Sequence, residues 1–213
     1  MKHILTLLVF LISVNVMAQE DPKYLEGAVP EVNGKVQFST KLMVNQPKAA
    51  VYQGMLKWAE TLSARPTNIE NHTRVGYTDE AKGEIVVVGE EWMVFSSGAL
   101  SLDRTRVYYT LRMICEDNLC NIYLTNLRYL YNEGRDAERM SAEEQITDKV
   151  TLTKDKKKLF KGYAKFRRKT IDLKDELFSE ASKAFGSQTI TTAKLVESTP
   201  VVVETAKPVE VVK

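Results

Sequence analysis

The fold is decided by two stretches, VYYTLRMI at residues 107–114 and IYLTNL at residues 122–127. Both alternate apolar with polar side chains, a pattern typical of strands that bury one face. The seven residues between them are short enough for a hairpin, either with a two-residue turn at Asp117 and Asn118 or with a four-residue loop. Both turns predict the same antiparallel pairs: Cys115 with Cys120, Met113 with Ile122, and Leu111 with Leu124.

The hairpin register brings Cys115 and Cys120 together. Residues next to the closing pair of a tight hairpin form a non-hydrogen-bonded pair, with Cα atoms about 4.5 Å apart and within reach of a disulfide. We therefore expect a disulfide if the compartment is oxidising, and two reduced, buried thiols otherwise. The spacing is not Cys-x-x-Cys, which disfavours a catalytic redox role.

Residues 1–18 have the pattern of a signal peptide. Lys2 gives a positive start, residues 4–16 are mostly apolar, and Ala18 ends a stretch that suits signal peptidase. The apolar stretch is too short for a permanent membrane span, and no later run reaches the roughly 20 residues that a span needs. We expect cleavage near Ala18, a periplasmic or extracellular location, and no stable membrane span in the mature form.

Length and composition indicate one domain with flanking segments. The chain has 213 residues, 44% of them hydrophobic, and a formal charge of +2. A chain so close to neutral has no overall attraction to nucleic acid, which is therefore an unlikely class of partner. We divide the chain into a signal peptide (residues 1–18), an irregular leader (19–34), a single α+β domain (35–185) and a disordered tail containing Val, Thr and Pro (186–213).

The periodicity of the domain predicts an antiparallel sheet of about five strands with two helices on one face, in the order β-α-β-β-β-β-α. The first helix begins near Ala49 and ends before Pro66, and the last helix covers residues 156–185. A strand from Gly83 is expected to pass through a bulge at Gly89 and end near Phe95. Ser141 and Glu144 have the spacing of a helix capping box.

Few residues suggest catalysis. His72 is the only histidine after the signal peptide, which disfavours catalytic triads and multi-histidine metal sites. No nucleotide-binding motif is present, so we assign no catalytic, cofactor or metal residue. Glu90, Glu91 and Asp103 are candidate carboxylates for a hydrolase, but surface positions near loop ends are the expected alternative.

Two groups of residues are candidates for binding. Tyr108 and Tyr123 are expected on the sheet face opposite Leu111, either as an exposed aromatic surface or beneath covering loops. Residues 154–169 are basic and form either an anion-binding face or a solvated helix surface with local ion pairs. The residues of that anion-binding candidate are Lys157, Lys158, Lys161, Lys165, Arg168 and Lys169.

Three motifs resemble a family of secreted bacterial proteins, domain of unknown function 4468. They are VPEVNGKV at residues 29–36, YYTL at 108–111 and KFRRKTID at 165–172, within a resemblance that covers residues 29–185. The chain departs from the family pattern at the hairpin turn and in its Val-rich tail. The resemblance implies a fold similar to the TATA-binding protein, and it implies no activity, because fold alone does not transfer function.

The sequence therefore favours a non-enzymatic binding or accessory module of the cell envelope, whose partner is an envelope protein or glycan. The alternatives are a carboxylate-dependent hydrolase of the envelope and a polyanion-binding protein that uses residues 154–169.

Overall fold

The computed structural model describes residues 20–98, 101–134 and 136–185. The predicted signal peptide and the predicted tail lie outside these residues. The main element is a six-stranded antiparallel sheet in the order β3-β7-β6-β5-β4, with β8 also paired to β7. Its strands are β3 (Phe38–Met43), β4 (Arg74–Asp79), β5 (Glu84–Ser97), β6 (Leu102–Glu116), β7 (Leu119–Tyr131) and β8 (Glu138–Ser141).

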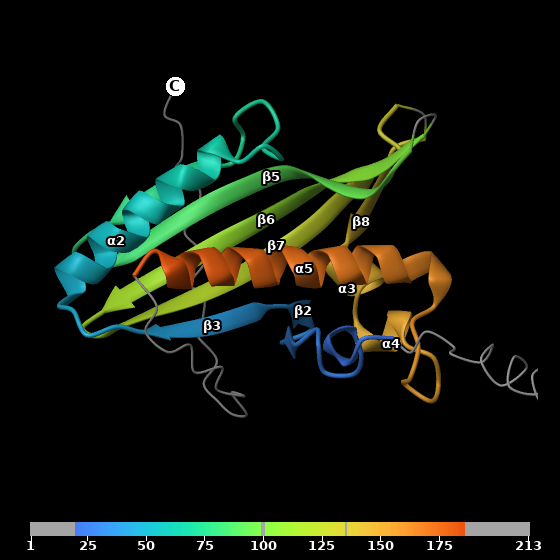
Figure 1. Cartoon of the computed structure of the whole chain (residues 1–213), viewed down its shortest axis with the longest axis horizontal. Coiled ribbons are helices and arrows are strands. Elements are labelled where there is room, and N and C mark those ends of the chain that lie inside the picture. The colour runs from blue at the N-terminus through green and yellow to red at the C-terminus, as the bar shows by residue number, and fades with distance from the viewer. Residues whose placement is uncertain (1–19, 99–100, 135, 186–213) are drawn as a thin grey trace, which may run out of the picture.

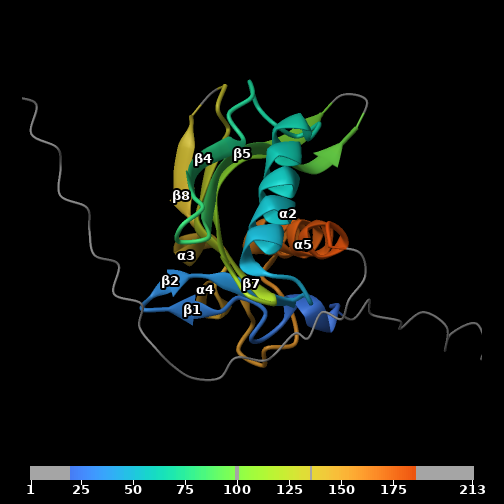
Figure 2. The ribbon, with the colours of Figure 1, turned by 90° about the vertical axis from the view of Figure 1, so that its left-hand side faces the viewer.

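Two long helices, α2 (Lys48–Thr61) and α5 (Lys161–Lys183), lie on the same face of this sheet (Figure 1). The sheet curves around them, as the side view shows (Figure 2). The remaining elements are short: η1 (Pro22–Tyr24), β1 (Glu31–Val32), β2 (Lys35–Val36), η2 (Leu62–Ala64), α3 (Ala142–Gln145) and α4 (Asp148–Thr151). None of the helices in the described part of the chain combines the length and apolar character that crossing a membrane requires.

The central hairpin has the predicted register. Cys115 pairs with Cys120, and the two turn residues include Asn118 at φ 63°, a left-handed conformation that Asn tolerates better than most residues. Cys115 donates its amide to the carbonyl of Gly83 on the other side of β6, as expected for a non-hydrogen-bonded pair with Cys120. The predicted alternation is thus confirmed, and it places the core between the hairpin and the helices.

Helix α5 begins five residues later than the periodicity predicted. Lys156 has φ 58°, a left-handed conformation that a helix does not accommodate. Leu159 instead forms an isolated bridge with Leu152 and packs in a small second core. The apolar spacing that extended the prediction to residue 156 therefore belongs to a loop with its own hydrophobic contact.

Strand β5 has no bulge at Gly89, contrary to the prediction. Gly89 pairs in regular register with Tyr109, and the irregularity lies between Val94 and Ser96. A Cβ atom added at Gly89 would stand 2.1 Å from the Tyr109 ring. The glycine is therefore required by the close approach of an aromatic ring rather than by the path of the strand.

The leader is more ordered than its polar composition indicated. Residues 20–36 contain η1 and the β1-β2 ribbon, and they pack beside α4 and α5 (Figure 1). Their anchor is Arg167 of α5, which is 0% exposed. Its guanidinium donates to the carbonyls of Tyr24, Leu25 and Ile146, to the hydroxyl of Thr151 and to the carboxylate of Asp148.

Candidate functional site

The sheet face turned away from α2 and α5 is the candidate functional site, and we call it the open face. Strand alternation assigns its residues: Leu111 and Met113 of β6 are fully buried toward the helices, whereas Arg112 between them points to the open face. Both long helices lie on the opposite side (Figure 2).

Arginine and lysine are distributed differently in the described residues. Lys41 is the one lysine on the open face, by its pairing with Asn121. The other lysines of the described residues are on helices, on loops or, for Lys35, on the short β1-β2 ribbon. The open face carries six arginines, assigned from the strand registers: Arg74, Arg104, Arg106, Arg112, Arg128 and Arg139. This face therefore presents guanidinium groups, which bind planar oxyanions in a way that lysine cannot.

The open face also exposes large apolar side chains. Leu102 is 54% exposed and Val88 is 44% exposed. Five of the eight most exposed large hydrophobic residues in the described part of the chain lie on this face: Met43, Tyr77, Val88, Val94 and Leu102. Exposed large apolar side chains gathered on one face of a soluble protein are a feature of interaction surfaces.

A cavity of about 860 Å³ lies where β5, β6 and β7 end, around Trp92. The guanidinium of Arg104 stands 3.6 Å from the centre of the Trp92 ring, and that of Arg106 stands 5.3 Å away. Arg106 is held on two sides, by Glu90 at 2.7 Å and by Glu133 at 2.7 Å. Both arginines line the cavity. Arg106 is fixed there by its two ion pairs, and Arg104 is stacked on Trp92.

Glu90 connects this cavity to the edge of the sheet. Its carboxylate is 2.7 Å from Nδ1 of His72 and also accepts from Arg106. Burial by itself raises the pKa of Glu90, but the hydrogen bonds from Arg106 and His72 outweigh it and lower the pKa below its ordinary value. His72 is itself part-exposed.

The two tyrosines predicted on this face are there. Tyr108 and Tyr123 are both half-buried, and Tyr108 pairs with Arg128, whose guanidinium lies 5.8 Å from the centre of the Tyr108 ring. Burial raises the pKa of Tyr108, so its hydroxyl stays neutral. Tyr108 also pairs with Glu90 of β5, so its neighbours on both sides are charged side chains of the open face.

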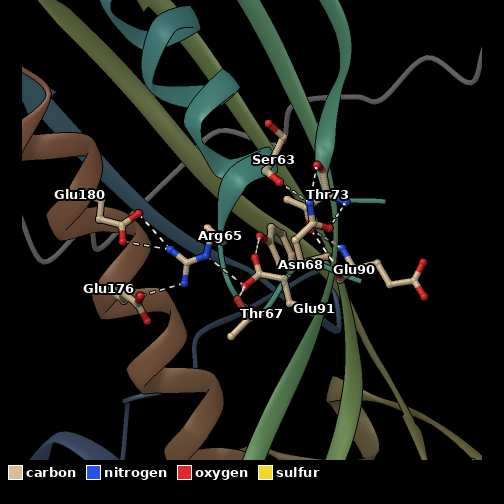
Figure 3. A network of polar contacts seen from close by, with 10 residues as sticks. Ser63, Arg65, Thr67, Asn68, Thr73, Glu90, Glu91, Glu176 and Glu180 are labelled. Atoms are coloured by element: carbon tan, nitrogen blue, oxygen red, sulfur yellow. Dashed lines mark hydrogen bonds and ion pairs between the residues drawn. The ribbon is translucent and has the colours of Figure 1, made fainter. Parts of the chain in front are cut away.

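A buried polar network on the helix side was not predicted (Figure 3). Glu91 is 2% exposed and accepts hydrogen bonds from Arg65 at 3.0 Å and from the hydroxyls of Thr67 and Tyr109. Arg65 also contacts Glu176 and Glu180 of α5, at 2.8 and 2.9 Å. One guanidinium thus joins the sheet, the segment after α2 and the last helix.

The expected surface position of Glu91 was therefore wrong. Glu91 follows the same alternation as Val87 and Met93, which points it into the core, and Arg65 supplies the charge that makes this burial tolerable. The signal was present in the strand period, but the partner 26 residues away was not visible from sequence.

The three candidate carboxylates do not converge. Glu90 is on the open face and Glu91 is on the helix face. Asp103 accepts from Lys165 at 2.9 Å and from the hydroxyl of Tyr131. Each carboxylate is held by its own cationic partner, so the arrangement offers no acid–base pair for hydrolysis.

The basic segment is divided between structural and solvent-exposed roles. Lys165 pairs with Asp103, and Arg168 pairs with Glu20 of the leader. The other four members of the predicted anion-binding face are exposed on α5 or on the loop before it: Lys157, Lys158, Lys161 and Lys169.

The two cysteines are thiols in this structure. Their sulfur atoms are 3.4 Å apart, and both side chains are 0% exposed. The hydrogen bond with Cys115, together with burial, raises the pKa of the Cys120 thiol well above its ordinary value. The predicted pairing in the sheet is confirmed, whereas a disulfide is not shown.

The chain is an α+β protein with a TBP-like fold: strand β3 and helix α2 are followed by the five strands β4 to β8 and then by helix α5, and both long helices lie on one face of the sheet. Residues 39–130 match the model of a domain of unknown function with this fold, DUF4468. A crystal structure of a DUF4468 family protein from Bacteroides ovatus is similar, with a TM-score of 0.74 and 46% identity over 79% of this chain and 96% of that one. The chain therefore belongs to the DUF4468 family.

A TBP-like protein from Parabacteroides distasonis shares the fold, with a TM-score of 0.59 and 20% identity over 73% of this chain and 96% of that one. No curated protein matches the chain. The comparisons thus establish the family and the fold, and they name no ligand.

Proposed function

We propose that this protein is a binding module without a catalytic role, and that the open face of the sheet is its binding surface. The observation that carries the proposal is the composition of that face, where exposed apolar side chains lie next to stacked arginines. Arg, Trp, Tyr and Met are enriched in protein interfaces and Lys is depleted. The separated carboxylates on the two faces give no support to a hydrolase.

Site-specific crosslinking tests this surface. A photo-crosslinking residue at Val88, on the open face, should give a discrete adduct in the cells that produce the protein. The matched control is the same residue at Lys57, which is exposed on α2 on the other side of the sheet, and it should give no such adduct. Equal adducts from both positions, or none from Val88, would contradict the proposal.

We also propose that the module works after export to the periplasm or the cell surface. The support is the signal-peptide pattern of residues 1–18, which lie outside the described residues. Protein expressed from its full gene should begin at Gln19 when its intact mass is measured. Recovery of the uncleaved chain from the cytoplasm would contradict export.

In such a compartment we propose that Cys115 and Cys120 become a disulfide. A disulfide-bearing thiol oxidoreductase takes up the two protons and two electrons that the thiols release as the sulfur–sulfur bond forms. Protein isolated from the envelope and denatured should then resist alkylation until it is reduced. The closed loop is short, so the bond should add little to the free energy of unfolding. Immediate alkylation of both thiols, without prior reduction, would refute the disulfide.

A further inference from the structure

Four arginines of the open face form no ion pair with any described residue. Arg74 donates to the backbone carbonyl of His72. The other three form no hydrogen bond with a described residue either: Arg104, Arg128 and Arg139. All three are exposed. Their neighbours differ, because Arg106 is paired with Glu90 and Glu133, and Arg112 with Glu84. The open face thus contains internally neutralised arginines and, toward the ends of β6, β7 and β8, three whose guanidinium groups have no carboxylate.

Two of these arginines are held in place by aromatic rings. Arg104 stacks on Trp92, and Arg128 lies over Tyr108. A guanidinium that stacks through its flat face keeps its N–H edge free to bind a carboxylate with two hydrogen bonds. The stacking also reduces the side-chain entropy that is lost on binding. The arrangement is thus suited to planar oxyanions at defined positions.

The surface around these arginines excludes several kinds of partner. Val94 and Leu102 are exposed beside Arg104, and a hydrated glycan would not bury them as a protein surface does. A formal charge of only +2 gives the chain no overall attraction to nucleic acid. A second copy of the chain would bring the same face against itself, and on that face Glu84, Glu90 and Glu133 are already paired with arginines of their own copy.

The size of the face also fits a protein partner. Strand β5 has 14 residues, which at roughly 3.3 Å each gives a length of about 45 Å. Four spacings of about 4.8 Å across the path from β3 to β4 give a width of about 19 Å. The resulting area of roughly 900 Å² is close to the 800 Å² per partner of a standard protein interface.

Building on the proposed function, we infer that the open face docks onto a protein that presents carboxylates next to apolar side chains. Arg104, Arg128 and Arg139 bind the carboxylates, and the exposed apolar residues beside Arg104 and along β5 form the dry part of the contact. Such a division between desolvated anchors and apolar contacts is typical of interface hot spots.

The test uses the Val88 crosslinker in two charge-matched backgrounds. One is R104Q/R128Q/R139Q, which removes these three arginines. The other is K157Q/K161Q/K169Q, which removes the same charge from exposed positions of the basic segment. We expect at least a tenfold loss of adduct in the arginine variant and no change in the lysine variant. Thermal unfolding of both variants should match the parent, since all six side chains are exposed.

The captured partner is then purified, and its crosslinked peptide is mapped. The inference requires Asp or Glu beside the mapped site and at least a tenfold weaker Kd for the arginine variant at 150 mM salt, with the difference falling as salt rises. An adduct unchanged in the arginine variant overturns the inference while the proposed function stands. Three other results also overturn the inference: loss of the adduct in the lysine variant, an adduct that resists protease, and an adduct with the mass of a second copy of the chain. The absence of any adduct from Val88 in the parent protein overturns the proposed function itself.

Discussion

At the scale of single residues, Gly89 determines the position of the Tyr109 ring, because the glycine has no side chain to exclude it. The ring of Tyr109 lies where a Cβ atom would be, and from there its hydroxyl donates to the buried Glu91. We expect Gly89→Ala to displace the ring and to lower the free energy of unfolding by about 2–4 kcal/mol, because overpacking and a lost buried hydrogen bond act together. Urea denaturation measures the effect.

The control for this prediction is Gly162→Ala in the first turn of α5. No atom lies within 4 Å of a Cβ added there, so alanine should raise the free energy of unfolding by up to about 1 kcal/mol through helix propensity. Equal effects of the two substitutions would contradict the role assigned to Gly89.

Arg167 gives a second prediction. Arg167→Met should lower the free energy of unfolding by about 3–5 kcal/mol, because the carbonyls of Tyr24 and Leu25 and the carboxylate of Asp148 lose their buried donor. Hydrogen exchange should rise in residues 20–36 before it rises in the sheet. Lys169→Met, two residues along the same helix and exposed, should stay within about 0.5 kcal/mol.

Glu90 gives a pH dependence. Its pKa in the folded protein is below the ordinary value of 4.5, so its ion pair stabilises the fold above that pH and is lost as the pH falls through the folded pKa. Glu90→Gln should therefore unfold more easily at pH 7 and show a shallower loss of stability between pH 5 and pH 3. Glu60→Gln, at an exposed position of α2, should keep the parent's slope.

At the scale of elements, Arg65 joins three parts of the fold, and its removal should show this. Arg65→Met leaves the carboxylate of Glu91 buried without its cation, which should cost about 3–5 kcal/mol of unfolding free energy. Glu176→Gln, at the 55% exposed end of the network, should cost less than about 1 kcal/mol. The two are compared by chemical denaturation, and equal losses would show that the buried pair has no special weight.

The elements also show how far the sequence could be interpreted. The hairpin register, the end of α2 near Pro66 and the capping box at Ser141 follow from local alternation and local chemistry, and all three are confirmed. Strand β8 was missed because its four residues have no alternation of their own. They form a strand only because they pair with residues 128–131 of β7. Local sequence patterns thus predicted the elements that depend on their own residues, and they missed the strand that depends on its partner.

The open face was only partly predictable. Alternation placed Tyr108 and Tyr123 on it, but the arginines gather there only once β4 to β8 are placed side by side. They are scattered between residues 74 and 139, so no sequence window shows a basic cluster. Residues 154–169 do form a basic window, but in the structure they are a loop and the start of a helix, and four of their basic side chains are in ion pairs: Lys156, Lys165, Arg167 and Arg168.

At the scale of the whole molecule, the sheet presents its strand arginines on the open face, while the formal charge of the chain is only +2. Net charge alone therefore conceals the feature on which the proposed binding depends. Specificity for a partner then rests on the positions of the guanidinium groups rather than on overall attraction.

The contacts of Arg167 with Tyr24 and Leu25 join residues that are 143 and 142 positions apart. The β5-β6-β7 meander, by contrast, is closed by neighbours in sequence and has no need to wait for distant segments. During synthesis the leader is made first, yet it has nowhere to dock until α5 exists. The segment that follows the predicted cleavage point thus becomes the last part of the native structure to form, and its docking marks the completion of the fold.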